Sequence, residues 1–413
     1  MTGDGIVLRA ITEPEYDRFR DSLSLVFGID PSEESRARLK RWIELDRTIA
    51  AFDGDHIVAT GGALTYRLVV PGGALVGAAG VTVVSVNPTH RRRGILTRMM
   101  RQQLEDIRDR GEPVAILRAS ESGIYGRFGY GCAVHAADLT IDRHRGTIRT
   151  DAPEPTGRVR LVPVDEARTV FPVVYRTASV DRLIPGAIER RPADWEGYFE
   201  DPEAEREGAS SARLALYESE AGTPTGYARY RHKPSWGPGG PDGTVLVSDI
   251  QAVDAEALAA LLRFLSSIDL TIKVEFDMMP RDSGIADLLA DPRQLRSSTY
   301  DLLWVRLVDV VAALEARRYR REGSVVVEVL DSFLPGSGGR FRLEGGPSGA
   351  ACVRTDEPAQ VRLQAGDLAA SYLGGSRLRT LAWLGRVVGE TETIGLLDDM
   401  LSWPVPPATS VRF

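Results

Sequence analysis

A run of three arginines followed by a glycine, Arg91–Gly94, is the part of the sequence best suited to binding an anion. It lies between a segment rich in β-branched residues, 80–86, and a segment from residue 95 whose apolar residues recur every three or four positions. These patterns predict a buried strand followed by an amphipathic helix. The N–H groups of a helix start attract phosphate, glycine admits it close to the backbone, and arginine grips its oxygens in a bidentate fork.

The arginine run also has a simpler explanation, a solvated basic surface. Its position between a strand and a helix favours phosphate binding instead. A nucleotide-binding P-loop is excluded, because no GK[ST] triplet follows and the loop has one glycine. We therefore interpret the loop as a phosphate-binding site.

A second candidate is Tyr125 in the glycine-rich segment GIYGRFGYG, residues 123–131. A phenol has a usual pKa of about 10, so it stays protonated at neutral pH and could donate a proton in a reaction. An aromatic residue in such a turn can equally be a packing residue, which is our interpretation of Tyr130. The residue type alone leaves both roles open for Tyr125.

The C-terminal segment PVPPATSVRF, residues 404–413, contains three prolines and apolar residues at positions 411 and 413. Chain termini are usually frayed and polar. This composition predicts a stiff end that docks onto the protein. His90, in the arginine loop, is expected to position that loop rather than to act as a base.

The elements that must position these residues form two similar runs and a third region. The first run begins with a helical segment and a hairpin at Asp53–Gly54. It continues with the strand before the arginines, the helix after them and a strand at 113–120. The strand–helix–strand order predicts parallel neighbours. A Pro- and Gly-bearing linker begins at residue 150, and the same order then recurs with Asp254 in place of the arginines. We therefore expect one anion site per chain.

The third region begins at residue 299 and shows a strand, a short helix, period-two strands and two short helical stretches around residues 368–373 and 377–385. Whole-chain composition limits the function further. The formal net charge of −7 argues against nucleic acid and anionic membranes as partners. Two distant cysteines, Cys132 and Cys352, suggest neither a disulfide framework nor a zinc site, so we expect no metal. The N-terminus lacks a signal-peptide pattern, and we expect a cytoplasmic protein.

The segments SVNPTHRRRGILTRMM (85–100) and ASESGIYGRFGYG (119–131) together resemble a known family. The strand, R-x-x-G loop and helix look like the acetyl-CoA site of the GCN5-related N-acetyltransferase (GNAT) superfamily. The combination is similar to the enhanced intracellular survival (Eis) family of actinobacterial aminoglycoside acetyltransferases. One departure is Leu96, which stands where the superfamily often has glycine or alanine.

The resemblance implies an α/β (α+β) fold with three domains. These are an N-terminal GNAT domain with the acetyl-CoA site at 1–149, a GNAT-like domain without that site at 150–298, and a sterol-carrier-protein-like domain at 299–413. It also implies an acetyl-CoA-dependent N-acetyltransferase that modifies a polycationic, aminoglycoside-like small molecule, at several positions in the family, and that assembles as a homohexamer.

The resemblance also assigns roles to residues of this sequence. Tyr125 would be the general acid, and the terminal carboxylate of Phe413 the general base. The acetyl-CoA residues would be Val84, Val86, Arg91, Arg92, Gly94, Ile95 and Ser120, with Arg93 assisting.

Acceptor recognition is less defined. Phe27, Asp30 and Trp42 could line a pocket for a polyamine, because carboxylates and aromatic walls attract cations. They could equally belong to an exposed helix. Two other functions stay open: acetylation of protein or peptide lysine amines, and non-catalytic lipid or ligand binding on a GNAT scaffold.

Overall fold

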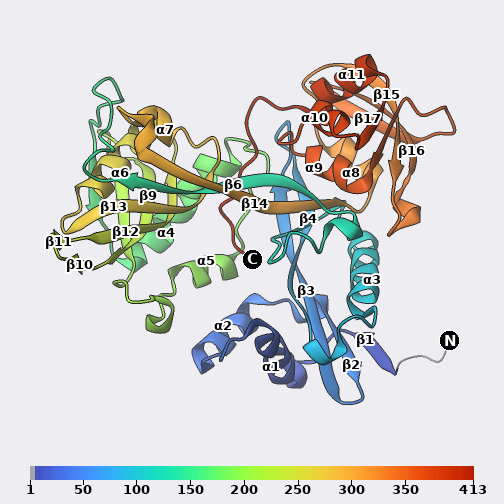
Figure 1. The fold of residues 1–413 in the computed structure, drawn as a ribbon, viewed down its shortest axis with the longest axis horizontal. Helices are drawn as coiled ribbons and strands as arrows, with labels where there is room; N and C mark the ends of the chain where they lie inside the picture. The colour runs from blue at the N-terminus through green and yellow to red at the C-terminus, as the bar shows by residue number, and fades with distance from the viewer. Residues whose placement is uncertain (1–4) are drawn as a thin grey trace. The chain divides into compact units, whose positions relative to one another are not determined.

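The computed structural model describes residues 5–413 (Figure 1). The chain divides into two compact units. The first comprises residues up to 134 together with 302–407 and 411–413, and the second comprises residues 135–301 and 408–410. Within the described residues, no helix is long and apolar enough to cross a membrane.

The N-terminal part of the first unit is built on a mixed sheet. Its strands, in spatial order, are β1 (Ile6–Arg9), β2 (Thr48–Asp53), β3 (His56–Val69), β4 (Leu75–Val86), β5 (Val114–Leu117) and the end of β14 (Leu295–Leu307). The predicted hairpin at Asp53–Gly54 is confirmed, with β2 antiparallel to β3. The strands β4 and β5 are parallel neighbours, as the strand–helix–strand order predicted.

Helices cover both faces of this sheet (Figure 1). They are α1 (Tyr16–Phe27), α2 (Glu33–Trp42) and α3 (Ile95–Asp109). Alternation along β2 separates the two faces: Phe52 packs with Phe19 of α1, whereas Ala51 packs with Met99 of α3. The predicted helix after the arginines is therefore α3, buried along one side.

The C-terminal part of the first unit is a five-stranded sheet with helices. Its strands, in spatial order, are β17 (Gly349–Arg354), β16 (Gly339–Gly346), β15 (Gly323–Leu330), β18 (Val361–Gln364) and β19 (Val387–Gly389). Its helices are α8 (Val310–Ala316), α9 (Ala365–Ser371), α10 (Leu378–Trp383) and α11 (Thr391–Leu401). The two predicted short helices correspond to α9 and α10, whereas α11 was not predicted.

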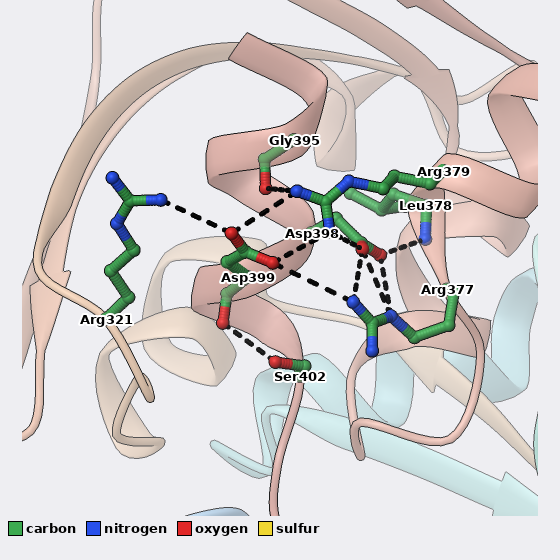
Figure 2. A network of polar contacts seen from close by, with 8 residues as sticks. All are labelled: Arg321, Arg377, Leu378, Arg379, Gly395, Asp398, Asp399 and Ser402. Carbon is green, nitrogen blue, oxygen red and sulfur yellow. Dashed lines mark hydrogen bonds and ion pairs between the residues drawn. The ribbon is translucent and has the colours of Figure 1, made fainter. Parts of the chain in front are cut away.

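A polar network joins α11 to the start of α10 (Figure 2). The buried Asp398 carboxylate accepts hydrogen bonds from the Arg377 side chain, at 2.6 Å, and from the backbone N–H of Leu378, also at 2.6 Å. Its neighbour Asp399 ion-pairs with Arg379 and Arg321. The carboxylate of Asp398 thus caps α10 from another helix.

The second unit repeats the first unit's order. Its strands, in spatial order, are β6 (Gly131–Asp142), β13 (Thr271–Pro280), β12 (Gly243–Ala252), β9 (Pro224–Lys233), β8 (Arg213–Glu218) and β7 (Arg158–Leu161), with a small hairpin of β10 (Trp236–Gly237) and β11 (Gly240–Pro241). Its helices are α4 (Val164–Tyr175), α5 (Pro192–Phe199), α6 (Ala255–Ser267) and α7 (Ile285–Leu288). The domain boundaries stay predictions, and the one expected between residues 298 and 299 lies within β14.

The strand-to-helix junction of the second unit differs from the arginine loop. The Asp254 side chain accepts a hydrogen bond from the backbone N–H of Ala257 and so caps α6. On β12, just beyond its last residue paired with β13, the buried Asp249 forms an ion pair of 3.1 Å with the buried Arg190. A carboxylate that already caps the helix therefore stands where the first unit has its arginines.

Candidate active site

The two parallel strands β4 and β5 separate where β4 reaches its C-terminal half. Their pairing runs from Ala78 opposite Val114 to Val81 opposite Leu117, and β5 ends there. The strand β4 continues for five residues, to Val86. Its edge is therefore no longer paired with β5 along the segment that holds Val84 and Val86. Such an edge can pair with an extended ligand through backbone groups.

A β-bulge shapes this free edge. Two residues of β4 stand opposite one residue of β3, because Thr60 pairs with Ser85 whereas Gly62 pairs with Thr82. Val83 has a φ of 49°, which is strained for a β-branched residue. The Thr60 hydroxyl lies 2.7 Å from the Val83 carbonyl oxygen and donates to it. Sequence analysis missed the bulge, since a glycine that would signal it is absent.

The arginine loop lies between β4 and α3, as predicted. Arg91 and Arg92 are exposed, and Arg92 adopts the left-handed region with a φ of 63°. Gly94, with a φ of 74°, precedes the first helical residue, Ile95, and contributes no capping side chain. The first N–H groups of α3 are therefore left for a ligand. Arg91 Nε donates a hydrogen bond of 3.3 Å to the Val86 carbonyl. An uncapped helix start beside exposed guanidinium groups fits a pyrophosphate.

Two neighbours of the loop clarify its chemistry. His90 contacts Thr89 Oγ1 at 2.8 Å through Nδ1 and Asp53 Oδ2 at 3.1 Å through Nε2. With both ring nitrogens engaged, His90 orients the loop, as expected. Leu96 is half-buried and packs with Val84 against the core beneath β4. The larger side chain of Leu96 therefore contributes to this core.

Tyr125 lies in the turn that follows β5. Its ring is buried in the same apolar cluster that Val84 contacts, and it meets the Tyr130 ring edge-on at 6.0 Å between centroids. Burial raises the pKa of Tyr125 above its usual value, and the nearby charge of Glu121 adds to the rise. The phenol therefore stays protonated at neutral pH. Ser120 is exposed and lies between β5 and this turn.

Tyr130 fits the packing role predicted for it. It is fully buried, and its hydroxyl has no hydrogen-bond partner among residues 5–413. Burial raises the pKa of its phenol strongly. A tyrosine in this environment contributes its ring rather than its hydroxyl.

The C-terminus is docked, as the tail composition predicted. The Phe413 ring lies against the Tyr66 ring of β3, with centroids 5.2 Å apart. It also covers Gly80 of β4, where an added Cβ would stand 3.2 Å from Phe413 Cδ2 and 2.6 Å from Tyr66 Cδ2. Val411 is 2% exposed. Neither Tyr66 nor Gly80 could have been singled out from the sequence.

The predicted acceptor residues lie around the first two helices. Phe27 ends α1 and is 48% exposed, Asp30 is exposed in the connection to α2, and Trp42 ends α2 and is half-buried. The three residues thus come from the ends of the two helices and from the connection between them. Within residues 5–413, no group of three or more His, Cys, Asp and Glu side chains could hold a metal ion.

Family models match each part of the chain. Two descriptions of an acetyltransferase (GNAT) domain match residues 7–133 and 186–307, and a sterol carrier protein domain matches residues 310–410. The predicted fold class is thereby confirmed: two tandem GNAT domains precede a domain similar to sterol carrier proteins.

Relatives extend this result to almost the whole chain. An uncharacterized N-acetyltransferase of Streptomyces avermitilis is 46% identical over 392 residues, which cover 94% of this chain and 93% of the relative. The N-acetyltransferase Eis of Mycobacterium tuberculosis is 35% identical over 396 residues and 92% of each chain. The crystal structure of Eis1 from Mycobacterium abscessus has a TM-score of 0.85 and 31% identity, covering 98% of this chain and 100% of that one. The chain is thus an acetyl-CoA-dependent N-acetyltransferase that belongs to the Eis family.

Proposed function

We propose that this enzyme transfers the acetyl group of acetyl-CoA directly to amines of a polycationic small molecule of the aminoglycoside type, at one or more positions. The observation that best supports this proposal is the docked end of the chain. The Phe413 ring rests on Tyr66 and Gly80, and Gly80 lies on β4, four residues before Val84. A terminal carboxylate anchored beside the strand expected to bind the co-substrate is well placed to act as a base.

In this proposal the free edge of β4 holds the pantetheine arm, and the arginine loop holds the pyrophosphate. Val84 and Val86 offer their backbone groups where β5 no longer pairs with β4. Around the pyrophosphate are Arg91, Arg92, Gly94 and Ile95, at the uncapped start of α3. Ser120, exposed after β5, is available to the co-substrate as well.

The chemistry follows from the groups around the thioester. The carboxylate of Phe413 takes a proton from the ammonium form of the acceptor, directly or through water, so that the amine can attack the thioester carbon. The N–H of Val84 stabilises the oxyanion that develops on the carbonyl oxygen. As the new C–N bond forms and the C–S bond breaks, the nitrogen loses its second proton to water and Tyr125 gives its proton to the thiolate. Solvent then restores both protonation states.

Acceptor specificity is the part of the proposal that depends most on residue types. Exposed Phe27 and Asp30, with half-buried Trp42, offer an aromatic surface and a carboxylate near the first two helices. Cationic amines are attracted to both kinds of group. An acceptor with several cationic amines would bind more tightly, because each amine can contact one of these groups.

A thiol-release assay tests the proposal. Acetyl-CoA is mixed with the enzyme and a panel of amines: kanamycin, a linear polyamine, a lysine peptide and a monoamine. We expect release of free CoA with kanamycin and much less with the monoamine. Release with the lysine peptide alone would replace the acceptor by a protein amine. No release with any amine, despite acetyl-CoA binding, would overturn the proposed acceptor class.

We also propose a homohexamer in the cytoplasm. Trp383 is 85% exposed at the end of α10, and Leu384 and Val388 beside it are exposed as well. Exposed apolar groups gathered at an edge strand such as β19 suit an interface between copies. Light scattering should give the mass of six chains, and the substitution Trp383→Glu should lower it. A monomeric mass for the unaltered enzyme would contradict the assembly.

A further inference from the structure

The Tyr125 turn is short and depends on neighbours for its shape. The Tyr125 carbonyl accepts hydrogen bonds from the N–H groups of Phe128, at 3.0 Å, and Tyr130, at 3.4 Å. Gly129 closes the turn with a φ of 81°. Because it contains two further glycines, at positions 123 and 126, the segment has little intrinsic stiffness.

A loop of the C-terminal domain, residues 331–334, supplies one support through Phe333. The Phe333 ring meets the Phe128 ring edge-on, with centroids 4.9 Å apart. Arg101 of α3 donates a hydrogen bond of 2.8 Å to the Phe333 carbonyl, and its guanidinium lies 4.8 Å from the Phe333 ring centroid. Phe333 therefore lies between the turn and α3, the helix whose start is expected to bind pyrophosphate.

A buried ion pair supplies the second support. Arg306 is fully buried and pairs with the buried Asp331. The other carboxylate oxygen of Asp331 accepts the N–H of Phe333, at 3.1 Å, and of Leu334, at 2.8 Å. An added Cβ at Gly129 would stand 2.6 Å from Arg306 Nη1, so the guanidinium lies directly against the turn. The ion pair thus connects the 331–334 loop to Gly129.

We infer that the 331–334 loop, through Phe333 and the Arg306–Asp331 pair, is a positioning element that holds the Tyr125 turn against α3. Neither Phe333 nor Arg306 reaches the reacting atoms; they act through Phe128 and Gly129. This inference rests on the proposed role of Tyr125 as the acid. It gives the C-terminal domain an indirect part in placing the phenol, and misplacing an acid by about 1 Å can lower a rate by as much as 100-fold.

The test uses the substitution Phe333→Leu in the full-length enzyme. Leucine keeps the site apolar but removes the edge contact with Phe128 and the cation–π contact with Arg101. We expect kcat to fall by about tenfold while the Kd for acetyl-CoA changes by less than about twofold. Hydrogen exchange at the N–H groups of residues 128–130 should rise. The matched control is Phe341→Leu, because Phe341 is also buried under an arginine, Arg354, but lies in the sheet of the C-terminal domain.

A second, milder variant guards against loss of folding. Arg101→Gln removes the hydrogen bond to the Phe333 carbonyl at a partly exposed position, and Arg108→Gln on the same helix is its control, since Arg108 is solvent-exposed. Arg101→Gln should raise exchange at residues 128–130 and lower kcat, whereas Arg108→Gln should change neither. Unchanged exchange in both Phe333→Leu and Arg101→Gln would overturn the inference.

A double variant separates this inference from the proposed mechanism. If Phe333 acts through Tyr125, then Phe333→Leu should cost little further activity in the Tyr125→Phe background. Additive losses would overturn the positioning role. If Tyr125→Phe alone leaves kcat unchanged while exchange still rises in Phe333→Leu, the proposed acid is wrong, and the inference falls with it.

Discussion

The ring of Phe413, the last residue of the chain, lies against the ring of Tyr66, with centroids 5.2 Å apart and planes inclined by 52°. Tyr66 is itself buried in β3 at 2% exposure. An aromatic pair of this geometry contributes about 0.5–1.5 kcal/mol beyond the area it buries. The contact therefore fixes the Phe413 ring on the sheet of the N-terminal domain.

Extending the chain by two alanines after Phe413 should abolish most of the activity. The added residues move the terminal carboxylate away from the proposed base position, while the Phe413 ring can still dock. We expect kcat to fall by about 100-fold or more, in the range found for loss of a general base. Acetyl-CoA affinity, measured by calorimetry, should be unchanged. Normal turnover by the extended enzyme would remove the carboxylate from the mechanism.

The substitution Gly80→Ala should destabilise the protein and loosen its C-terminus. The new methyl group would stand 2.6 Å from the Tyr66 ring, which has to move and disturb the seat of Phe413. Overpacking of this kind costs about 1–3 kcal/mol in free energy of unfolding. Gly77→Ala on the same strand is the control, because its methyl group would meet Glu112 at 3.7 Å, an ordinary contact. Urea unfolding and digestion by carboxypeptidase measure the two effects.

Replacing Tyr125 by phenylalanine should lower kcat by about 100-fold, with little change in acetyl-CoA affinity. In the unaltered enzyme, burial disfavours the phenolate and raises the pKa of Tyr125, so the acid form persists past the usual tyrosine pKa of about 10. Turnover should therefore show no loss from this group below that pH and fall above it. A pH profile measured by thiol release checks both statements.

Tyr130→Phe is the matched control for that substitution. It removes a fully buried hydroxyl that lacks a hydrogen-bond partner among the described residues. Activity should be unaffected, and the free energy of unfolding should stay equal or increase, because an unsatisfied buried hydroxyl is costly. If Tyr130→Phe and Tyr125→Phe lowered kcat alike, the assignment of the acid to Tyr125 would be wrong.

Neutralising the arginine loop should weaken acetyl-CoA binding. Arg91→Gln and Arg92→Gln each remove a guanidinium from an exposed position beside the start of α3, and we expect about a tenfold rise in Kd for each. Arg93→Gln should have a smaller effect, because Arg93 already lies 4.0 Å from the Asp53 carboxylate. Calorimetry at two salt concentrations measures these changes. Equal Kd values for all three variants and the unaltered enzyme would contradict a pyrophosphate site here.

Local patterns predicted the elements of the site, because each has a short-range signature. The hairpin at Asp53–Gly54, the strand before the arginines and the helix after Gly94 follow from turn residues and hydrophobic periodicity. In the third region α11 was not predicted, although its buried apolar residues recur at helical spacing.

The residues missed by sequence analysis act through long-range contacts or backbone strain. Val83 lies in a segment whose sequence is typical of a strand, and only the pairing of β4 with β3 shows the bulge there. Tyr66 lies 347 residues before Phe413, and Phe333 lies far from Phe128 in sequence. No periodicity or spacing links such pairs. The general acid and the general base could be proposed from the family resemblance. The residues that hold them in position could be identified only from the fold.

Acetyl-CoA should bind with a stoichiometry of one per chain, although the chain has two GNAT domains. In the second unit, Asp254 already accepts the N–H of Ala257 at the start of α6, and its carboxylate would repel a phosphate. Calorimetry should give a single class of sites, and Arg91→Gln combined with Arg92→Gln should weaken all of the binding. As a control, Asp254→Asn keeps a cap and should leave the stoichiometry at one. A second acetyl-CoA that survives the double arginine variant would contradict the assignment of the site to the first domain, since the N-terminal loop would then be one of two places where the helix start receives pyrophosphate.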